Sequence, residues 1–308
     1  MDETAQHGHA PPYRRLQATV PPGAQSIAVL ATCVTLAVTA VFTTVAGLTT
    51  VAGRSTLPTT SETETAESPV SVPLTVPGMV EDVAGHSVLG RPIRRLCIGA
   101  GPAILIMASI HGTEAAGTHL VSRLGELLIE SPGEFCVDRL IILMPVVNPD
   151  GVENQTRGNA NGVDLNRNFP AENRENTKRY GMTALSEPEA LAIYQTIEKY
   201  QPVRIITLHE PLCCVDYDGP GLAVATAMAE VSPLPVKKLG TRPGSMGAFT
   251  GEARKIPTIT LELPRDAKQQ SAEELWQLYG PAMSVAVTHP IEPVVEATPV
   301  DGTVSGSP

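Results

Sequence analysis

Short apolar blocks and longer mixed blocks alternate along the chain between residues 78 and 290. The apolar blocks contain few polar residues, which is typical of strands buried on both faces of a sheet. Longer, helix-like blocks separate them. We therefore expect an α/β fold in which helices cover both faces of a sheet. The expected strands are 94–98, 103–110, 139–147, 203–208 and 256–263, and the expected helices are 115–130, 186–200 and one that starts at residue 271.

Two of the expected helices carry start signals. The run Ser186-Glu-Pro-Glu places acidic residues and a proline in the first turn of one helix, where the unpaired backbone N–H groups favour them. Ser271 stands at the N-cap of the last helix, and Glu274 occupies the position that completes a capping box. These signals predict where both helices begin.

The segment 26–53 is free of charged residues and rich in Ala, Val, Leu and Thr. It is longer than the ~20 apolar residues that a membrane-spanning helix needs. Arg14 and Arg15 precede it, so the positive-inside rule keeps the N-terminus in the cytoplasm and places the rest of the chain outside. We expect a single N-terminal apolar helix that anchors a single-pass protein in the cell membrane. The alternatives are an exported protein whose signal peptide is cleaved after Ala40 or Gly53, a buried helix, or a mis-assigned start codon.

The other flanking segments lack the apolar residues that a folded core needs. Residues 1–25 are polar and proline-containing and are expected to be disordered. Residues 54–77 form a linker of Ser, Thr, Pro and Glu, and residues 291–308 are expected to be a disordered tail. The folded domain is therefore expected at 78–290. The net charge of −10 argues against a nucleic-acid partner, which would require a basic surface.

Polar residues suited to metal chemistry follow four of the apolar blocks. Active sites of α/β sheets gather beyond the carboxyl ends of strands, so these residues are expected to meet. A His, Glu and His set is one of those that hold a catalytic zinc and leave one position for water. Taken alone, however, a His-x-x-Glu pair is a weak signal. The residues are His111 with Glu114, His209, and Glu262, and the remaining block is followed by Asn148-Pro-Asp-Gly151, which is a turn signal.

Glu262 is not needed as a ligand in this set. A carboxylate beside metal-bound water can take a proton from that water and later deliver it to a leaving amine. The alternative for Glu262 is an ordinary salt bridge at the end of a strand.

The loop 157–170 is too polar and too rich in Gly and Asn for a strand or a helix. It contains Arg157 and Arg167, and guanidinium groups bind carboxylates through two parallel hydrogen bonds. The composition therefore suits a loop that binds a carboxylate or an oxyanion. The alternative is an ordinary surface loop.

These motifs occur in the order and approximate spacing of the M14 zinc carboxypeptidases, which the chain resembles over about residues 78–285. The loop 157–170 looks most like that of the murein peptide amidase A branch, and residues 243–247 are similar to its substrate loop. The resemblance implies a zinc carboxypeptidase-like fold with a mixed, mostly parallel sheet. The motifs are His111-x-x-Glu114, Asn148-Pro-Asp-Gly151, Gly162-Val-Asp-Leu-Asn-Arg-Asn-Phe169, His209 and Thr260-Leu-Glu-Leu-Pro264.

The resemblance also implies a metal centre. His111, Glu114 and His209 would bind one zinc ion. Asp164 would accept a hydrogen bond from His111 and so fix the tautomer of its imidazole.

The remaining site residues would act on the substrate. Glu262 would be the general base and then the general acid. Arg157 would polarise the scissile carbonyl and hold the oxyanion. Asn166 and Arg167 would bind the terminal carboxylate of the peptide.

The expected function is a zinc-dependent peptidase or amidase that releases a C-terminal amino acid from a short peptide by Glu262-assisted attack of zinc-bound water. The resemblance narrows the substrate to a murein peptide, cut between γ-D-glutamate and meso-diaminopimelate. A domain held outside the cytoplasm would lie where wall peptides are. The alternatives are a related N-acyl-amino-acid amidohydrolase of the aspartoacylase or succinylglutamate desuccinylase type, and a non-catalytic module that binds wall peptides.

The chain departs from the family in one loop. Many M14 carboxypeptidases carry a tyrosine on a mobile loop before the catalytic glutamate, and residues 240–256 contain none. Either Tyr217 or Tyr180 covers the substrate, or no phenol does. No residue between 244 and 251 predicts which leaving side chain the pocket accepts.

Overall fold

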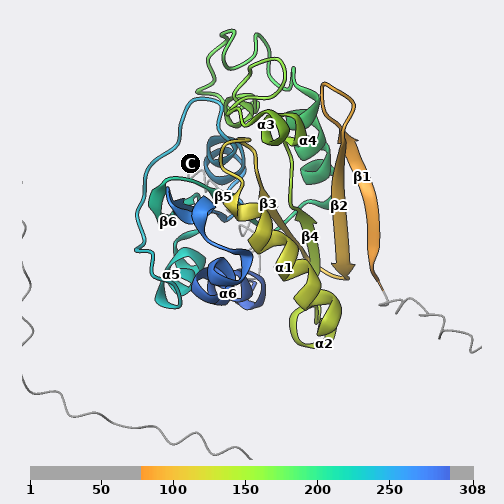
Figure 1. Cartoon of the computed structure of the whole chain (residues 1–308), viewed down its shortest axis with the longest axis vertical. Coiled ribbons are helices and arrows are strands. Elements are labelled where there is room, and N and C mark those ends of the chain that lie inside the picture. Colours follow the sequence, from red (N-terminus) through yellow and green to blue (C-terminus); the bar gives the residue numbers. More distant parts are fainter. Residues whose placement is uncertain (1–77, 292–308) are drawn as a thin grey trace, which may run out of the picture. The chain divides into compact units, whose positions relative to one another are not determined.

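Seven strands form one mixed sheet in the order β1–β2–β4–β3–β5–β7–β6 in the computed structural model, which describes residues 78–291 (Figure 1). The expected N-terminus 1–25, membrane segment 26–53 and linker 54–77 lie outside the described residues, as does the expected tail from residue 292 on. No helix within 78–291 is long and apolar enough to cross a membrane. The strands are β1 (Val80–His86), β2 (Pro92–Gly99), β3 (Ala103–Ala108), β4 (Leu140–Met144), β5 (Arg204–His209), β6 (Leu212–Asp218) and β7 (Thr258–Pro264).

The centre of the sheet is parallel and its edges are antiparallel. Strands β4, β3, β5 and β7 pair in parallel, whereas β1, β2 and β6 are joined by antiparallel pairings. The mixed sheet is thus confirmed, with its parallel part limited to the four central strands. These strands are buried on both faces, which explains their nearly continuous apolar sequences.

Helices cover both faces of the sheet, as expected (Figure 1). One hydrophobic core lies between the sheet and α1, α5 and α6. A second core lies between the other face and α4, together with the π-helical segment η2. The helices are α1 (Ala116–Glu130), α2 (Pro132–Phe135), α3 (Pro149–Asn154), α4 (Pro188–Tyr200), α5 (Leu222–Glu230) and α6 (Ala272–Thr288), and the short helical segments are η1 (Leu165–Arg167), η2 (Gly247–Ala253) and η3 (Ala267–Gln269).

The predicted helix starts agree closely with the structure. Ser271 Oγ accepts a hydrogen bond from the Glu274 N–H at 3.2 Å, and the Ser271 N–H donates to Glu274 Oε2 at 2.8 Å, so the capping box before α6 is confirmed. Helix α4 begins at Pro188 rather than at Ser186, because Glu187 is still extended. Pro188 then occupies the first helical position, where its missing N–H has no cost.

Close packing between α1 and β5 brings Glu114 and His209 close together. A Cβ atom on Gly117 would lie 2.6 Å from the Leu208 Cβ atom, so only glycine lets the helix approach the strand this closely. Helix α1 begins two residues after Glu114, and β5 ends at His209. The helix contact therefore helps to fix the distance between these side chains.

Candidate active site

Three neighbouring parallel strands bring the predicted site residues together. His111 and Glu114 follow β3, His209 is the last residue of β5, and Glu262 lies near the end of β7. The β5–β7 register places His209 directly opposite Glu262. Because the strands are parallel and in register, their carboxyl ends meet at one edge of the sheet, as the sequence predicted.

The turn after β3 aims His111 and Glu114 at this edge. Strand β3 ends at Ala108, two residues before the predicted end, because Ser109 adopts the left-handed backbone conformation with φ 55°. Gly112 then packs on the backbone of α3, where a Cβ atom would lie 1.9 Å from the Gly151 carbonyl carbon. A side chain at position 112 would therefore displace both neighbouring site residues.

The three predicted ligands fit a zinc ion. His111 Nδ1 lies 2.9 Å from Glu114 Oε2, His209 Nδ1 lies 2.8 Å from the same oxygen, and the two Nδ1 atoms are 3.2 Å apart. Tetrahedral ligands bound at 2.0–2.1 Å are separated by roughly 3.3 Å, so these atoms need little movement to share one ion. All three side chains are buried. Three ligands leave a fourth position for water.

Charged groups behind the ligands hold them in place. His111 Nε2 lies 3.0 Å from Asp164 Oδ1, so the imidazole can donate there while Nδ1 faces Glu114. The Arg157 guanidinium donates to Asp164 Oδ2 at 3.0 Å and to Glu114 Oε1 at 2.7 Å. Burial alone would raise the pKa of Glu114 and Asp164. His111 and His209 nevertheless lower the pKa of Glu114 well below its usual range, and His111 and Arg157 do the same for Asp164. Both groups are therefore carboxylates at neutral pH.

Asp150 does not join this cluster, although it also follows a central strand. Its carboxylate accepts hydrogen bonds from Ser87, the Leu89 N–H and Arg91, all in the connection between β1 and β2. Asn148 caps α3 and donates to the Ile110 carbonyl oxygen. The polar residues that follow β4 thus form the turn expected from Asn148-Pro-Asp-Gly151 and fasten it beside the site.

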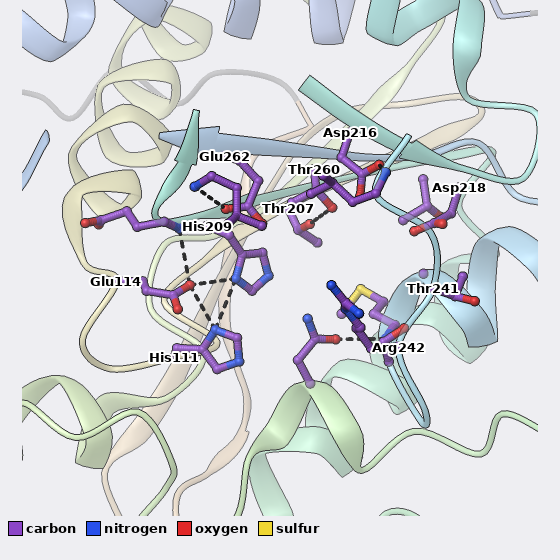
Figure 2. Close-up of a pocket in the computed structure, with 18 of the residues that line it drawn as sticks. His111, Glu114, Thr207, His209, Asp216, Asp218, Thr241, Arg242, Thr260 and Glu262 are labelled. Carbon is purple, nitrogen blue, oxygen red and sulfur yellow. Dashed lines mark hydrogen bonds and ion pairs between the residues drawn. The ribbon is translucent and has the colours of Figure 1, made fainter. Parts of the chain in front are cut away.

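The ligands open onto a cavity of about 250 Å³ (Figure 2). The other predicted site residues, Glu262, Arg157, Asn166 and Arg167, line the same cavity. Glu262 is buried, which raises the pKa of its carboxyl, and its Oε2 accepts a hydrogen bond from the Leu212 N–H at 3.3 Å. Asn166 Oδ1 accepts from the Met246 N–H at 2.9 Å, which fastens the loop before η2 to η1.

Neither tyrosine considered for the substrate cover reaches the cavity. Tyr217 and Tyr180 are absent from its lining within the described part of the chain. The side chain of Tyr217 points instead to the opposite face of the sheet, against the core formed with α1, α5 and α6. Leu239 and Arg242, on the loop between α5 and η2, line the cavity instead.

Comparisons with known proteins agree with this geometry. The family model for zinc carboxypeptidases matches residues 74–212. Murein peptide amidase A of Escherichia coli (strain K12) is 32% identical over 210 residues, which cover 62% of this chain and 84% of the relative. The chain belongs to the zinc carboxypeptidase family. It is accordingly a hydrolase rather than a non-catalytic binding module, and His111, Glu114 and His209 are its zinc-binding triad.

The chain is also similar in sequence or in fold to other zinc carboxypeptidases. Murein peptide amidase A of Vibrio campbellii is 34% identical over 200 residues, which cover 58% of this chain and 77% of the relative. The crystal structure of murein-tripeptide amidase MpaA from Escherichia coli O157 matches 69% of this chain and 93% of its own, with 29% identity and a TM-score of 0.50. Bovine thrombin-activatable fibrinolysis inhibitor matches 69% of this chain and 90% of its own with a TM-score of 0.60, and at 18% identity this likeness concerns the fold alone.

Strand β6 contributes pocket residues that the sequence analysis missed. Asp216 and Asp218 line the cavity from this strand, which was not predicted. The signal was present, because polar residues at 216 and 218 alternate with Val215 and Tyr217 at the period of a strand buried on one face. An edge strand that faces a polar cavity lacks the continuous apolar run that marks the central strands.

The buried Asp218 carboxyl predicts a pH-dependent stability. Burial, with smaller contributions from Asp216 and Glu252, raises the pKa of Asp218 from 3.8 to about 6. The folded chain then binds this proton more tightly than the unfolded chain, so stability falls as pH rises from about 4 to about 6 and stays lower above that range. Asp218→Asn should therefore increase the free energy of unfolding at about pH 8 by on the order of 2 kcal/mol, with no gain below about pH 4.

Urea unfolding of the zinc-loaded protein at both pH values measures this difference. Glu273→Gln is the matched control, because it removes the same charge from an exposed side chain on α6 and should bring no gain. An Asp218→Asn variant that is no more stable than the wild type at the higher pH would contradict the prediction.

Proposed function

We propose that the chain releases the C-terminal amino acid of a murein peptide by hydrolysing the bond between γ-D-glutamate and meso-diaminopimelate. The observation that carries this proposal is the similarity to murein peptide amidase A over 84% of that relative's length. The polar loop 157–170, which resembles the same branch, lines the cavity through Arg157, Asn166 and Arg167.

Arg167 and Asn166 are suited to bind the free carboxylate of the substrate. Both line the cavity, and both are only partly buried, so their polar groups remain accessible. Asn166 Oδ1 accepts a hydrogen bond from the Met246 N–H, so the amide nitrogen of Asn166 remains to donate to the substrate carboxylate. The guanidinium of Arg167 adds a positive charge and a pair of parallel donors. A terminal carboxylate held here leaves the preceding amide bond near the zinc triad.

Proton transfer is the role proposed for Glu262. When bound by the triad, zinc supplies a Lewis acid that polarises a carbonyl and lowers the pKa of water. The Leu212 N–H holds Glu262 Oε2, so Oε1 is the oxygen available to take the proton from the attacking water. The same oxygen then gives the proton to the leaving nitrogen as the C–N bond breaks, and the products are a carboxylic acid and a free amine.

Arg157 is suited to hold the negative charge that develops on the carbonyl oxygen. Its side chain lines the cavity and is 41% exposed, while its Nε contacts Asp164 and its Nη1 contacts Glu114. These contacts fix the guanidinium before the substrate arrives. A hydrogen-bond donor that is already in position stabilises the charge that develops in the transition state most strongly, because the side chain need not move during the reaction.

We also propose that residues 26–53 hold the enzyme at the cell membrane with its catalytic domain outside the cytoplasm. The proposal rests on the uncharged sequence and on the arginines before it. Export after signal cleavage would place the domain in the same compartment.

Replacing the proposed base should separate zinc binding from turnover. Glu262→Gln keeps the shape of the side chain but cannot accept the proton, so turnover should fall about 10²-fold or more while zinc content is unchanged. Metal analysis and the rate of amino-acid release are measured on the same sample. Glu273→Gln, on the exposed surface of α6, is the matched control and should keep full activity. Near-normal turnover of zinc-loaded Glu262→Gln would remove Glu262 from the mechanism.

The substrate is tested with three peptides and with N-acyl amino acids, using the full chain. L-Ala-γ-D-Glu-meso-diaminopimelate should lose its terminal residue, its α-linked isomer should react much more slowly, and the peptide with an amidated C-terminus should be a poor substrate. Faster cleavage of the α-linked isomer would indicate a general carboxypeptidase instead. Equal cleavage of the amidated peptide would contradict the role of Asn166 and Arg167, and cleavage of N-acyl amino acids alone would favour the amidohydrolase alternative.

A further inference from the structure

The loop 157–164 begins and ends with active-site residues. Arg157 Nε donates to Asp164 Oδ2 at 3.0 Å, and Nη1 donates to Glu114 Oε1 at 2.7 Å. Within the described part of the chain Nη2 has no partner, so it is the nitrogen available to a substrate carbonyl. The Arg157 carbonyl oxygen accepts from the Gly112 N–H at 3.4 Å, which is longer than an ordinary hydrogen bond. The place of Arg157 therefore depends on the rest of its loop.

Asn159 closes this loop into a tight turn. Its N–H donates to the Val163 carbonyl oxygen at 3.0 Å, and its own carbonyl oxygen accepts from the Gly162 N–H at 2.9 Å. Its side-chain Oδ1 accepts from the N–H groups of Asn161 and Val163, each at 3.1 Å. An asparagine that accepts from backbone N–H groups just ahead of it stabilises a turn in this way. The two ends of the loop are thereby held together.

The other end of the Asn159 amide fastens the turn to helix α4. Asn159 Nδ2 donates to Glu187 Oε2 at 2.7 Å and to Glu189 Oε2 at 2.9 Å. Glu187 is the N-cap of α4 and Glu189 lies in its first turn, so a helix carries both acceptors. Glu189 Oε1 also accepts from the Val88 N–H at 3.1 Å, in the connection between β1 and β2. The loop is thus tied to two elements outside the active site.

Every hydrogen-bonding position of the Asn159 side chain is used. An amide has two donor hydrogens and two acceptor lone pairs, and two carboxylates and two backbone N–H groups take them here. The residue is 3% exposed and is not among the residues of 78–291 that line the cavity. Hydrogen bonds to charged acceptors are the strong ones, and a buried carboxylate that loses its donor is costly. Asn159 is therefore a hub behind the site rather than a group that meets the substrate.

The turn is coupled directly to Arg157. A Cβ atom on Gly158 would lie 2.8 Å from both the Gly162 carbonyl carbon and the Val163 carbonyl oxygen, so the chain next to Arg157 packs on the turn without a gap. A displaced turn would therefore displace Arg157 as well.

The other site residues of this region have separate anchors. The Asp164 N–H donates to the Arg179 carbonyl oxygen at 2.8 Å, and Asn166 Oδ1 accepts from the Met246 N–H at 2.9 Å. A loosened turn should therefore move Arg157 more than the residues that orient the zinc ligands or bind the terminal carboxylate.

We propose that Asn159 is a positioning residue for the reaction: by holding the turn against Glu187 and Glu189, it fixes Arg157 with Nη2 toward the scissile carbonyl. Asn159 acts only through Arg157 and does not touch the substrate. The inference rests on the oxyanion role proposed for Arg157. It also gives the two carboxylates at the start of α4 a part in turnover, although neither lines the cavity.

Asn159→Asp tests this role, because it keeps the acceptor for the turn and replaces the donor nitrogen with an oxygen that faces two carboxylates. With the full zinc-loaded chain and L-Ala-γ-D-Glu-meso-diaminopimelate, kcat should fall about 10-fold or more, whereas KM and zinc content should change less than about 2-fold. Adding Glu189→Gln should recover most of the lost kcat, because the new amide can donate to the new carboxylate. Asn154→Asp, the same change of charge at the exposed end of α3, is the matched control and should keep full kcat.

A double-mutant cycle with Arg157→Ala separates positioning from a general effect on the fold. If Asn159 acts through Arg157, Asn159→Asp should lower kcat by less than about 2-fold in the Arg157→Ala background. An equal loss of kcat in both backgrounds would contradict the inference. So would a loss that Glu189→Gln does not recover.

The same variants distinguish this inference from the proposed function. Full kcat of Arg157→Ala would overturn the oxyanion role and the inference with it, whereas a loss in Arg157→Ala beside full kcat of Asn159→Asp would overturn the inference alone. An α-linked acylated dipeptide is assayed in parallel, and turnover of this peptide alone would overturn the murein assignment while the cycle is measured on it. If Asn159→Asp did not fold, Glu187→Gln combined with Glu189→Gln would weaken the same anchor from α4, and unchanged kcat there would contradict the inference.

Discussion

The parallel register of β3, β5 and β7 is the constraint on which the site depends. It places His209 opposite Glu262 and puts the turn after β3 beside both. A shift of one residue between β5 and β7 would turn either the histidine or the glutamate to the other face, because side chains alternate along a strand. Buried apolar side chains on both faces of these strands hold the register, so the hydrophobic core determines the geometry of the metal site.

Charges buried beside the metal are stabilised by one another. Glu114 contacts both imidazoles and Arg157, and Asp164 contacts His111 and the same arginine. Each carboxylate therefore has partners for both oxygens, which offsets the cost of leaving water. Asp218 is the contrasting case at the other end of the cavity, because its carboxylate is equally buried and its Oδ1 has no partner. The two carboxylates beside the metal are thus held in place by the fold itself.

Much of this arrangement could be predicted from the sequence. The continuous apolar runs identified the central strands, and the polar residues after them identified the zinc triad. The capping signal at Ser271 identified the start of α6. Edge strands β1 and β6 were not predicted, since one of their faces is polar and neither forms a continuous apolar run. Asp216 and Asp218 were missed with β6, because their importance depends on the register with β7 rather than on any local motif. The different roles of Asp150 and Glu262, both acidic residues near strand ends, likewise follow from tertiary contacts.

Zinc content and peptide release, measured together on the full chain, test the account most directly. We predict one zinc ion per chain, parallel loss of zinc and amino-acid release on treatment with a chelator, and recovery of both with one equivalent of zinc. His209→Ala should bind zinc far more weakly and should not release amino acid at stoichiometric zinc, because it removes one of three ligands. Full release of the terminal residue by zinc-free protein, or by His209→Ala without bound zinc, would contradict the account.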